Sequence, residues 1–170
     1  MSEPPTLAAL VIGLGNPLMA DDGLGLAALE RLRQDWEIPP SVRLVDGGTW
    51  GMNLLPLIED AEQVILLDAI DAGRPAGTPV TLERSEVPRY FGHKLSPHQV
   101  DLREVLALAE LRGHLPADLV AIGLQPARVE MATGLSREVA AGVDDLLAAL
   151  VSRLRQWGHP LRPAPRLVHA

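Results

Sequence analysis

The fold is decided by the stretch Leu7-Ala-Ala-Leu-Val-Ile-Gly-Leu-Gly-Asn-Pro-Leu-Met-Ala-Asp-Asp-Gly-Leu-Gly25. It opens with a continuous apolar run, Leu7–Ile12, which is typical of a strand buried on both faces. Glycines follow at once, and two adjacent carboxylates then precede a helical pattern over Gly23–Gln34. A buried strand that turns through glycines into a helix indicates an α/β fold.

This glycine turn differs from the turns that bind nucleotides. A dinucleotide fingerprint requires a third glycine where this chain has Leu18, and the Gly-Lys-Ser/Thr ending of a P-loop is absent. Asn16, Asp21 and Asp22 instead offer hard oxygen groups, which suit a metal ion better than a phosphate. A nucleotide-binding domain remains one alternative, and failure to bind nucleotides would exclude it.

Apolar strands continue to alternate with helical patterns along the chain. The patterns predict strands at Val42–Val45, Val64–Leu67 and Leu119–Leu124, an edge strand at Val80–Glu83, an irregular stretch from Arg84 to Leu95, and helices at Gly51–Asp60, from Ser96 to about Leu111, and from Ser136 to Gly158. We therefore predict a single α/β domain over residues 1–157, with a mostly parallel twisted sheet of about five strands sandwiched between helices. Residues 158–170 are predicted to form a loose Pro/Arg-rich tail.

Composition excludes several classes of protein. The 170 residues carry a formal net charge of −7, which disfavours nucleic acid as a partner. The chain has no cysteine, so thiolate nucleophiles and zinc–thiolate sites are absent, and a cytoplasmic location is expected. No apolar stretch approaches a membrane span, and the start Met1-Ser-Glu-Pro-Pro5 lacks the cationic residues of a signal peptide.

Three polar side chains are expected near the carboxyl ends of the strands, where ligands bind in such sheets. Asp22 follows the first strand, Asp68 ends the third, and His98 lies in the first turn of a helix. Two carboxylates and one imidazole suit a borderline divalent ion such as Ni²⁺ or Zn²⁺. The positive end of the helix disfavours imidazolium, which keeps His98 neutral and able to bind metal.

Each of these residues also has a structural interpretation. Asp22 can cap the helix that follows it, and Asp68 can hold a neighbouring loop through backbone N–H groups. His98 can be a partly exposed structural residue, and His93 is a rival ligand. The segment Asp46-Gly-Gly-Thr49 is either a tight turn or a mobile loop that touches a substrate.

An ordered set of motifs then resembles the [NiFe]-hydrogenase maturation endopeptidases. The resemblance covers about residues 7–156 and is carried by Gly13-x-Gly-Asn-x-Leu-x-x-Asp-Asp-Gly-x-Gly25, Asp46-Gly-Gly-Thr49, Leu67-Asp-Ala-Ile70, Lys94-Leu-Ser-Pro-His-Gln99, Gly123-Leu-Gln-Pro126 and Gly134-Leu-Ser136. One such motif is weak, whereas the ordered set is specific. The resemblance implies a twisted sheet between helices.

The resemblance also implies an activity and a partner. Members of this family remove the C-terminal extension of the [NiFe]-hydrogenase large-subunit precursor after nickel insertion. The positions that contact the metal correspond to Asp22, Asp68 and His98, which are therefore the expected catalytic and metal-binding residues. Some members have Glu where this chain has Asp22, so Asp21 is a candidate helper. The nickel is expected to arrive mainly with the precursor.

Two roles for that metal stay open. It can polarise the scissile carbonyl or activate water, as in a metal-dependent endopeptidase, or it can serve recognition while a separate base, as in an aspartyl-type enzyme, activates water. No Gly-x-Ser-x-Gly elbow occurs, so a Ser-His-Asp hydrolase is not indicated. A non-catalytic chaperone that checks nickel in the large subunit is the alternative function.

Overall fold

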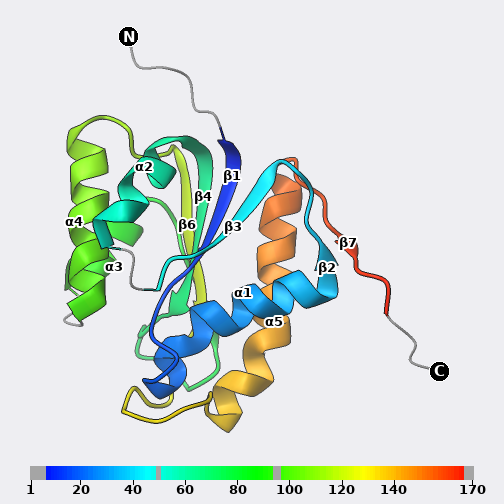
Figure 1. The fold of residues 1–170 in the computed structure, drawn as a ribbon. Helices are drawn as coiled ribbons and strands as arrows, with labels where there is room; N and C mark the ends of the chain where they lie inside the picture. The colour runs from blue at the N-terminus through cyan, green and yellow to red at the C-terminus, as the bar shows by residue number, and fades with distance from the viewer. Residues whose placement is uncertain (1–6, 49–50, 94–96, 167–170) are drawn as a thin grey trace.

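The protein is a three-layer α/β domain. The computed structural model describes residues 7–48, 51–93 and 97–166, and the side chains of these residues except 92–101. The main sheet has the strand order β3-β1-β4-β6-β5 (Figure 1). Its strands are β1 (Leu7–Gly13), β3 (Val42–Asp46), β4 (Ala61–Ala69), β5 (Pro79–Leu82) and β6 (Asp118–Leu124). All pairs are parallel except β5–β6, so the predicted fold class is confirmed.

Helices cover both faces of the sheet because the central strands are apolar on both sides. On one face, odd-numbered residues of β1 and β4, such as Val11 and Ile65, and even-numbered residues of β6, such as Ile122, pack against α1 (Leu24–Asp35) and α5 (Arg137–Gln156). On the other face, even-numbered residues of β1 and β4, such as Leu66, and odd-numbered residues of β6, such as Ala121, pack against α2 (Leu54–Glu59), α3 (Val87–His93) and α4 (Pro97–Leu111). Two 3₁₀ turns, η1 (Ala20–Gly23) and η2 (Gly51–Asn53), precede α1 and α2.

Helix α5 follows the predicted pattern closely. Ser136 is its N-cap, and the Ser136 hydroxyl accepts a hydrogen bond from the backbone N–H of Val139 at 3.3 Å. The apolar stripe from Val139 to Leu154 is buried against the sheet. Gly158, with φ +92°, follows the end of the helix.

Two sequence predictions are wrong in detail. The stretch Arg84–Leu95 was expected to be irregular but contains α3, because Val87 and Phe91, one helical turn apart, are both buried in the core. A helix this short forms through tertiary packing rather than through its own propensity, and Gly92 obscures its pattern. Strand β4 begins three residues before the predicted Val64 and ends one residue after Asp68, at Ala69.

Part of the C-terminal tail is packed rather than loose. Leu161 is buried, and β7 (Arg162–Pro163) pairs antiparallel with β2 (Trp36–Glu37) in a small second sheet that the sequence did not reveal. His159 is also buried, with Nδ1 2.8 Å from the Ser41 hydroxyl and Nε2 2.7 Å from Oε1 of Gln63. These contacts tie the tail to the end of the sheet where the strands begin.

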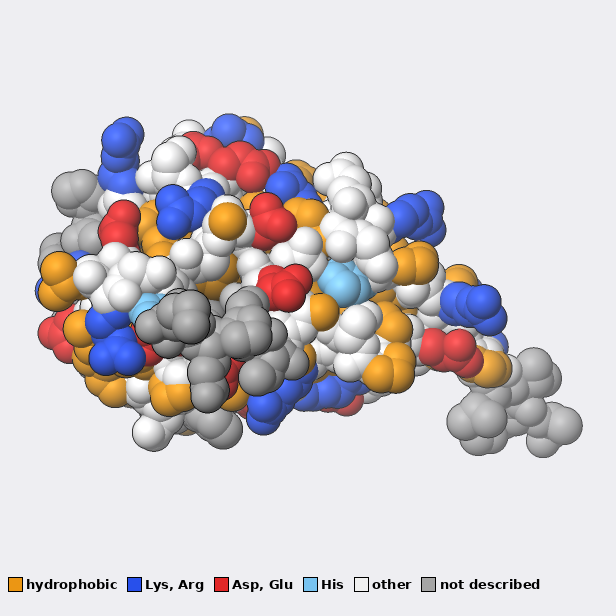
Figure 2. Space-filling model, turned by 90° about the horizontal axis from the view of Figure 1, so that it is seen from above, with side chains coloured by type: hydrophobic (Ala, Val, Ile, Leu, Met, Phe, Trp, Pro, Cys, Tyr) orange, Lys and Arg blue, Asp and Glu red, His pale blue; other side chains and the backbone are white. Residues whose placement is uncertain are grey.

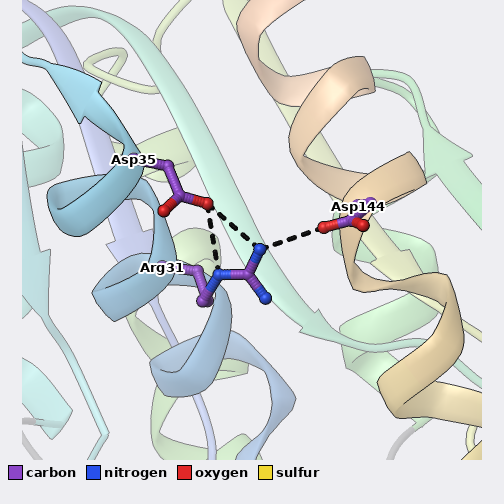
Figure 3. A network of polar contacts seen from close by, with 3 residues as sticks. All are labelled: Arg31, Asp35 and Asp144. Carbon is purple, nitrogen blue, oxygen red and sulfur yellow. Dashed lines mark hydrogen bonds and ion pairs between the residues drawn. The ribbon is translucent and has the colours of Figure 1, made fainter. Parts of the chain in front are cut away.

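An exposed ion-pair network joins the two helices on one face (Figure 3). Arg31 of α1 donates to Asp35 at 3.0 Å through one nitrogen and at 3.2 Å through another, and it reaches Asp144 of α5 at 3.0 Å. Because all three side chains are exposed to a large degree, the network contributes little to stability.

The surface carries both signs of charge. Figure 2 views the end of the molecule at which β1 begins, and basic and acidic side chains are interspersed over it. Within the described part of the chain, none of the helices has the length and apolarity that a membrane span requires.

Candidate functional site at the carboxyl edge of the sheet

Asp22 is buried beside the turn that follows β1. Its side chain is 4% exposed, and Oδ2 accepts a hydrogen bond from the backbone N–H of Asn16 at 2.9 Å. Gly15 has φ +105°, and a Cβ at this position would collide with the carbonyl oxygen of Asp22. Gly23, not Asp22, occupies the N-cap of α1, so the interpretation of Asp22 as that helix's cap is not supported.

Asp68 is fully buried one residue before the end of β4. Its Oδ1 accepts a hydrogen bond from the backbone N–H of Ala69 at 2.9 Å. The neighbours Leu66 and Ile70 belong to the core beneath α2, α3 and α4, so strand alternation directs Asp68 to that same face. The 3₁₀ turn η1, which carries Asp22, packs against β4. The structure thus brings the elements that hold the two predicted carboxylates together.

Asp21, the neighbour of Asp22, accepts several hydrogen bonds from the loop between β6 and α5. Its Oδ2 accepts hydrogen bonds from the backbone N–H groups of Ala127 and Arg128 at 2.9 and 3.0 Å and from the Ser136 hydroxyl at 2.9 Å. Its Oδ1 accepts from the Ser136 N–H at 2.7 Å. Burial raises the pKa of Asp21, but the hydrogen bonds from Ser136, Arg128 and Ala127 outweigh it and lower the pKa below its ordinary value.

Backbone pairing strengthens the same junction between loops. Ala20 donates from its N–H to the carbonyl of Ala132 at 2.8 Å, and Ala132 donates to the carbonyl of Leu18 at 3.1 Å. Ala20 has φ +53°, which is unusual for a residue other than glycine. The loop before α5 therefore holds the turn that carries Asp22 from two sides, and Asp21 is a structural anchor of this arrangement.

Gln125 is a buried polar residue to which the sequence pattern gave no role. Its Oε1 accepts hydrogen bonds from the N–H groups of Ala72 and Arg74 at 2.7 and 3.1 Å, and its Nε2 donates to Asp71 at 3.0 Å. It thereby fixes the Gly/Pro-rich loop that follows β4. Its place in the motif Gly123-Leu-Gln-Pro126 was the available signal.

His98 lies in the first turn of α4, and that helix begins at the end of the molecule where β1 ends (Figure 1). The side chains of His98 and its rival His93, and the predicted cap Ser96, lie outside the described residues. Among the residues that are described, no group of three His, Cys, Asp or Glu side chains is placed to hold a metal ion. The predicted triad therefore stays a prediction. Its donor set of two buried carboxylates and an imidazole is one that fits a borderline divalent ion.

A groove of about 540 Å³ lies beside these residues at the edge of the sheet. One wall is the edge strand β3, from Arg43 to Asp46. The other wall consists of Gly15, Asn16 and Pro17 after β1, together with Leu26 of α1. Asp46 accepts a hydrogen bond from the Gly48 N–H at 3.1 Å, so the start of the Asp46–Thr49 segment is a tight turn.

Comparison with known proteins assigns a family to this arrangement. A family model described as hydrogenase maturation protease matches residues 26–153. The chain belongs to the hydrogenase maturation protease family. It is 43% identical over 151 residues to the hydrogenase expression/formation protein HupD of Rhodobacter capsulatus. This match covers 88% of this chain and 72% of HupD.

Other members of the hydrogenase maturation protease family agree in sequence and in fold. The hydrogenase 2 maturation protease of Escherichia coli K12 is 37% identical over 150 residues, covering 88% of this chain and 92% of that protein. The solved structure of the hydrogenase maturating endopeptidase HybD from E. coli superimposes with a TM-score of 0.88 at 35% identity, covering 92% of this chain and 98% of HybD. The family resemblance inferred from the motifs is confirmed, as is a protease as the class of enzyme.

Proposed function

We propose that this protease removes the C-terminal extension of a [NiFe]-hydrogenase large-subunit precursor after nickel insertion, and that Asp22, Asp68 and His98 contact the nickel carried by that precursor. The observation that carries the proposal is the burial of two carboxylates on contacting elements at one edge of the sheet, in a chain of the hydrogenase maturation protease family. A cytoplasmic location stays a prediction from composition.

The burial of Asp22 and Asp68 supports a role with a cation. A buried carboxylate is costly unless a cation or hydrogen-bond donors compensate it. Backbone N–H groups are among the groups that compensate them here, with Asn16 donating to Asp22 and Ala69 donating to Asp68. A metal ion delivered by the substrate would add the positive charge that two buried carboxylates favour. Nickel-loaded precursor would then bind more tightly than nickel-free precursor, which makes nickel occupancy a condition for cleavage.

Cleavage requires addition of one water molecule to the scissile carbonyl carbon, transfer of a proton to the amide nitrogen and rupture of the C–N bond. In this proposal Asp22, Asp68 and His98 hold the substrate's nickel beside that bond. They orient the peptide, and the cation stabilises negative charge that develops on the carbonyl oxygen. A base separate from these three residues takes the proton from the attacking water.

The proposal is tested with the precursor itself. The protein is incubated with nickel-loaded and with nickel-free precursor, and the mass of the large subunit is followed over time. Loss of the C-terminal extension from the nickel-loaded form alone is the expected result. Cleavage of both forms would overturn the nickel requirement. Binding without any mass change would instead identify a nickel-checking chaperone.

A further inference from the structure

The edge strand β3 has main-chain N–H and C=O groups that lie in the plane of the sheet and point away from β1. Ala9 donates to the carbonyl of Ser41 at 3.0 Å, and Gly47 donates to the carbonyl of Gly13 at 2.8 Å, so odd-numbered residues of this segment bond to β1. In a parallel ladder the intervening residues point the other way. Among the described residues, none hydrogen-bonds to the outward N–H or C=O of Leu44.

The groove of about 540 Å³ runs along this same edge. Successive side chains of a strand point to opposite faces of the sheet, as the cores show here, where Val45 packs beneath α2 and Leu44 packs on the α1 side. A cavity lined by every residue from Arg43 to Asp46 therefore follows the strand's exposed backbone edge and not one face. Its volume of about 540 Å³ lies within the range of protein ligand sites.

The groove leads to the candidate site. Its far wall includes Asn16, whose backbone N–H donates to Oδ2 of Asp22 at 2.9 Å. Gly15 and Gly48 also line it, and their lack of side chains lets another backbone approach. Leu26 and Pro17 supply apolar surface, whereas Arg43 and Asp46 supply one charge of each sign.

We propose that β3 binds an extended segment of the precursor next to the scissile bond by adding it as a further strand to the sheet. This inference rests on the proposed function. An unpaired strand edge recognises main chain rather than a particular side chain, and strand addition is a common way to hold a peptide. The occupant would place a small or apolar side chain against Leu26 and Pro17 and would deliver the following residues to Asp22.

The test uses three variants of the full chain and steady-state processing of nickel-loaded precursor. Leu44→Pro removes the outward N–H, and Leu44→Ala removes the same side chain but keeps the N–H. Thr81→Pro is the control on the opposite edge. The backbone carbonyl of Thr78 accepts a hydrogen bond from the N–H of Gln125 at 2.8 Å, so the main chain of Thr78 faces β6. Residues of an antiparallel strand alternate between facing the partner strand and facing away, so the main chain of Thr81, three residues later, points outward.

We expect Leu44→Pro to raise KM about tenfold relative to Leu44→Ala, with kcat within about twofold, because a lost hydrogen bond of ordinary strength weakens binding by that order. Thr81→Pro should leave both constants unchanged. Equal KM values for Leu44→Pro and Leu44→Ala would overturn strand addition. If the wild type itself cuts no precursor, the proposed function has failed, and that outcome is separate.

Hydrogen exchange on the wild-type protein covers the case in which Leu44→Pro does not fold. Protection should increase over Val42–Asp46, and not over Pro79–Leu82, when nickel-loaded precursor is added. Unchanged exchange in Val42–Asp46 overturns the proposal. Protection that rises with protein concentration without precursor, together with a dimer in analytical ultracentrifugation, would show that a second copy of this chain occupies the edge and would also overturn it.

Discussion

The two ends of the sheet bury different kinds of polar group. Where the strands begin, the buried group is His159, and its partners are the neutral hydroxyl of Ser41 and the amide oxygen of Gln63. Where the strands end, the buried polar residues include three acids, Asp21, Asp22 and Asp68, beside the neutral Gln125 and Ser136. A neutral hydrogen-bonded group is inexpensive to bury, whereas buried acids cost more and indicate either strong compensation or a ligand.

The acids themselves divide into two kinds. Asp21 receives four hydrogen bonds from the loop before α5, which account for its burial without a ligand. Asp22 and Asp68 are the pair that the proposed function uses. His159 thus holds the tail, Asp21 closes a loop, and Asp22 and Asp68 contact the nickel in the function that we propose. Substitutions at each position should affect different measurements.

The largest effect is expected at Asp68. Asp68→Asn preserves size but removes the charge that attracts a cation, so processing should fall by at least about a hundredfold, as for loss of a group that acts in the chemical step. The melting temperature should change little, because the amide oxygen still accepts from Ala69. Processing is measured by mass spectrometry, with Asp145→Asn on the exposed face of α5 as the control. Normal cleavage by Asp68→Asn would remove this residue from the site.

His98 is expected to come next. His98→Ala should lower processing about ten- to a hundredfold, because a neutral imidazole donates a lone pair to the metal and alanine cannot. The matched variant is His93→Ala, which should process normally. Cleavage assays and thermal melts on both variants decide the assignment. The reverse outcome, with His93→Ala inactive and His98→Ala active, would mean that the motif was aligned on the wrong histidine.

The sequence was sufficient to predict most of the sheet, one long helix and the family. The sheet was predictable because three of its five strands, β1, β4 and β6, contain continuous apolar runs. Helix α5 was predictable because Ser136 caps a long regular apolar stripe. The ordered motifs led to the family. Helix α3 was missed because its stability comes from burying Val87 and Phe91 against distant strands, which no local pattern contains.

The different surroundings of Asp21 and Asp22 could not be predicted from the sequence either. The sequence makes Asp21 a candidate helper at the metal, but its carboxylate oxygens accept hydrogen bonds from residues more than a hundred positions away in the chain. The same holds for β2 and β7, which are two residues each and pair only because His159 and Leu161 return the tail to the domain. Long-range hydrogen bonds of this kind leave no periodicity behind.

Asp21 should affect stability before chemistry. Asp21→Ala leaves the part-buried N–H donors of Ala127 and Arg128 and the buried donors of Ser136 without their acceptor, and should lower the free energy of unfolding by about 3 kcal/mol. Chemical denaturation measures this loss. Processing at a temperature where the variant stays folded should fall much less than in Asp68→Asn. A variant as stable as the wild type would show that the anchor is dispensable.

The lowered pKa of Asp21 gives this anchor a pH dependence of known sign. A folded-state pKa below the unfolded value of 3.8 means that the contribution is fully present above that value and is lost as pH falls through the folded pKa. The stability difference between wild type and Asp21→Asn should therefore be constant near neutral pH and shrink below about pH 4. A difference that stays constant into acid would contradict the assignment of the shift to Asp21.

The smallest effect is expected at the other end of the sheet. In neutral His159, Nε2 faces the Gln63 amide oxygen and must carry the proton, so Nδ1 accepts from the Ser41 hydroxyl. Ser41→Ala removes that donor and should lower the free energy of unfolding by about 1 kcal/mol, the net worth of a part-buried hydrogen bond. Because the candidate site lies at the other end of the sheet, where the strands end, KM and kcat for the precursor should match the wild type. A stability loss without a kinetic change would separate the tail's tether from the chemistry, whereas a change in kcat would mean that the two ends of the sheet are coupled.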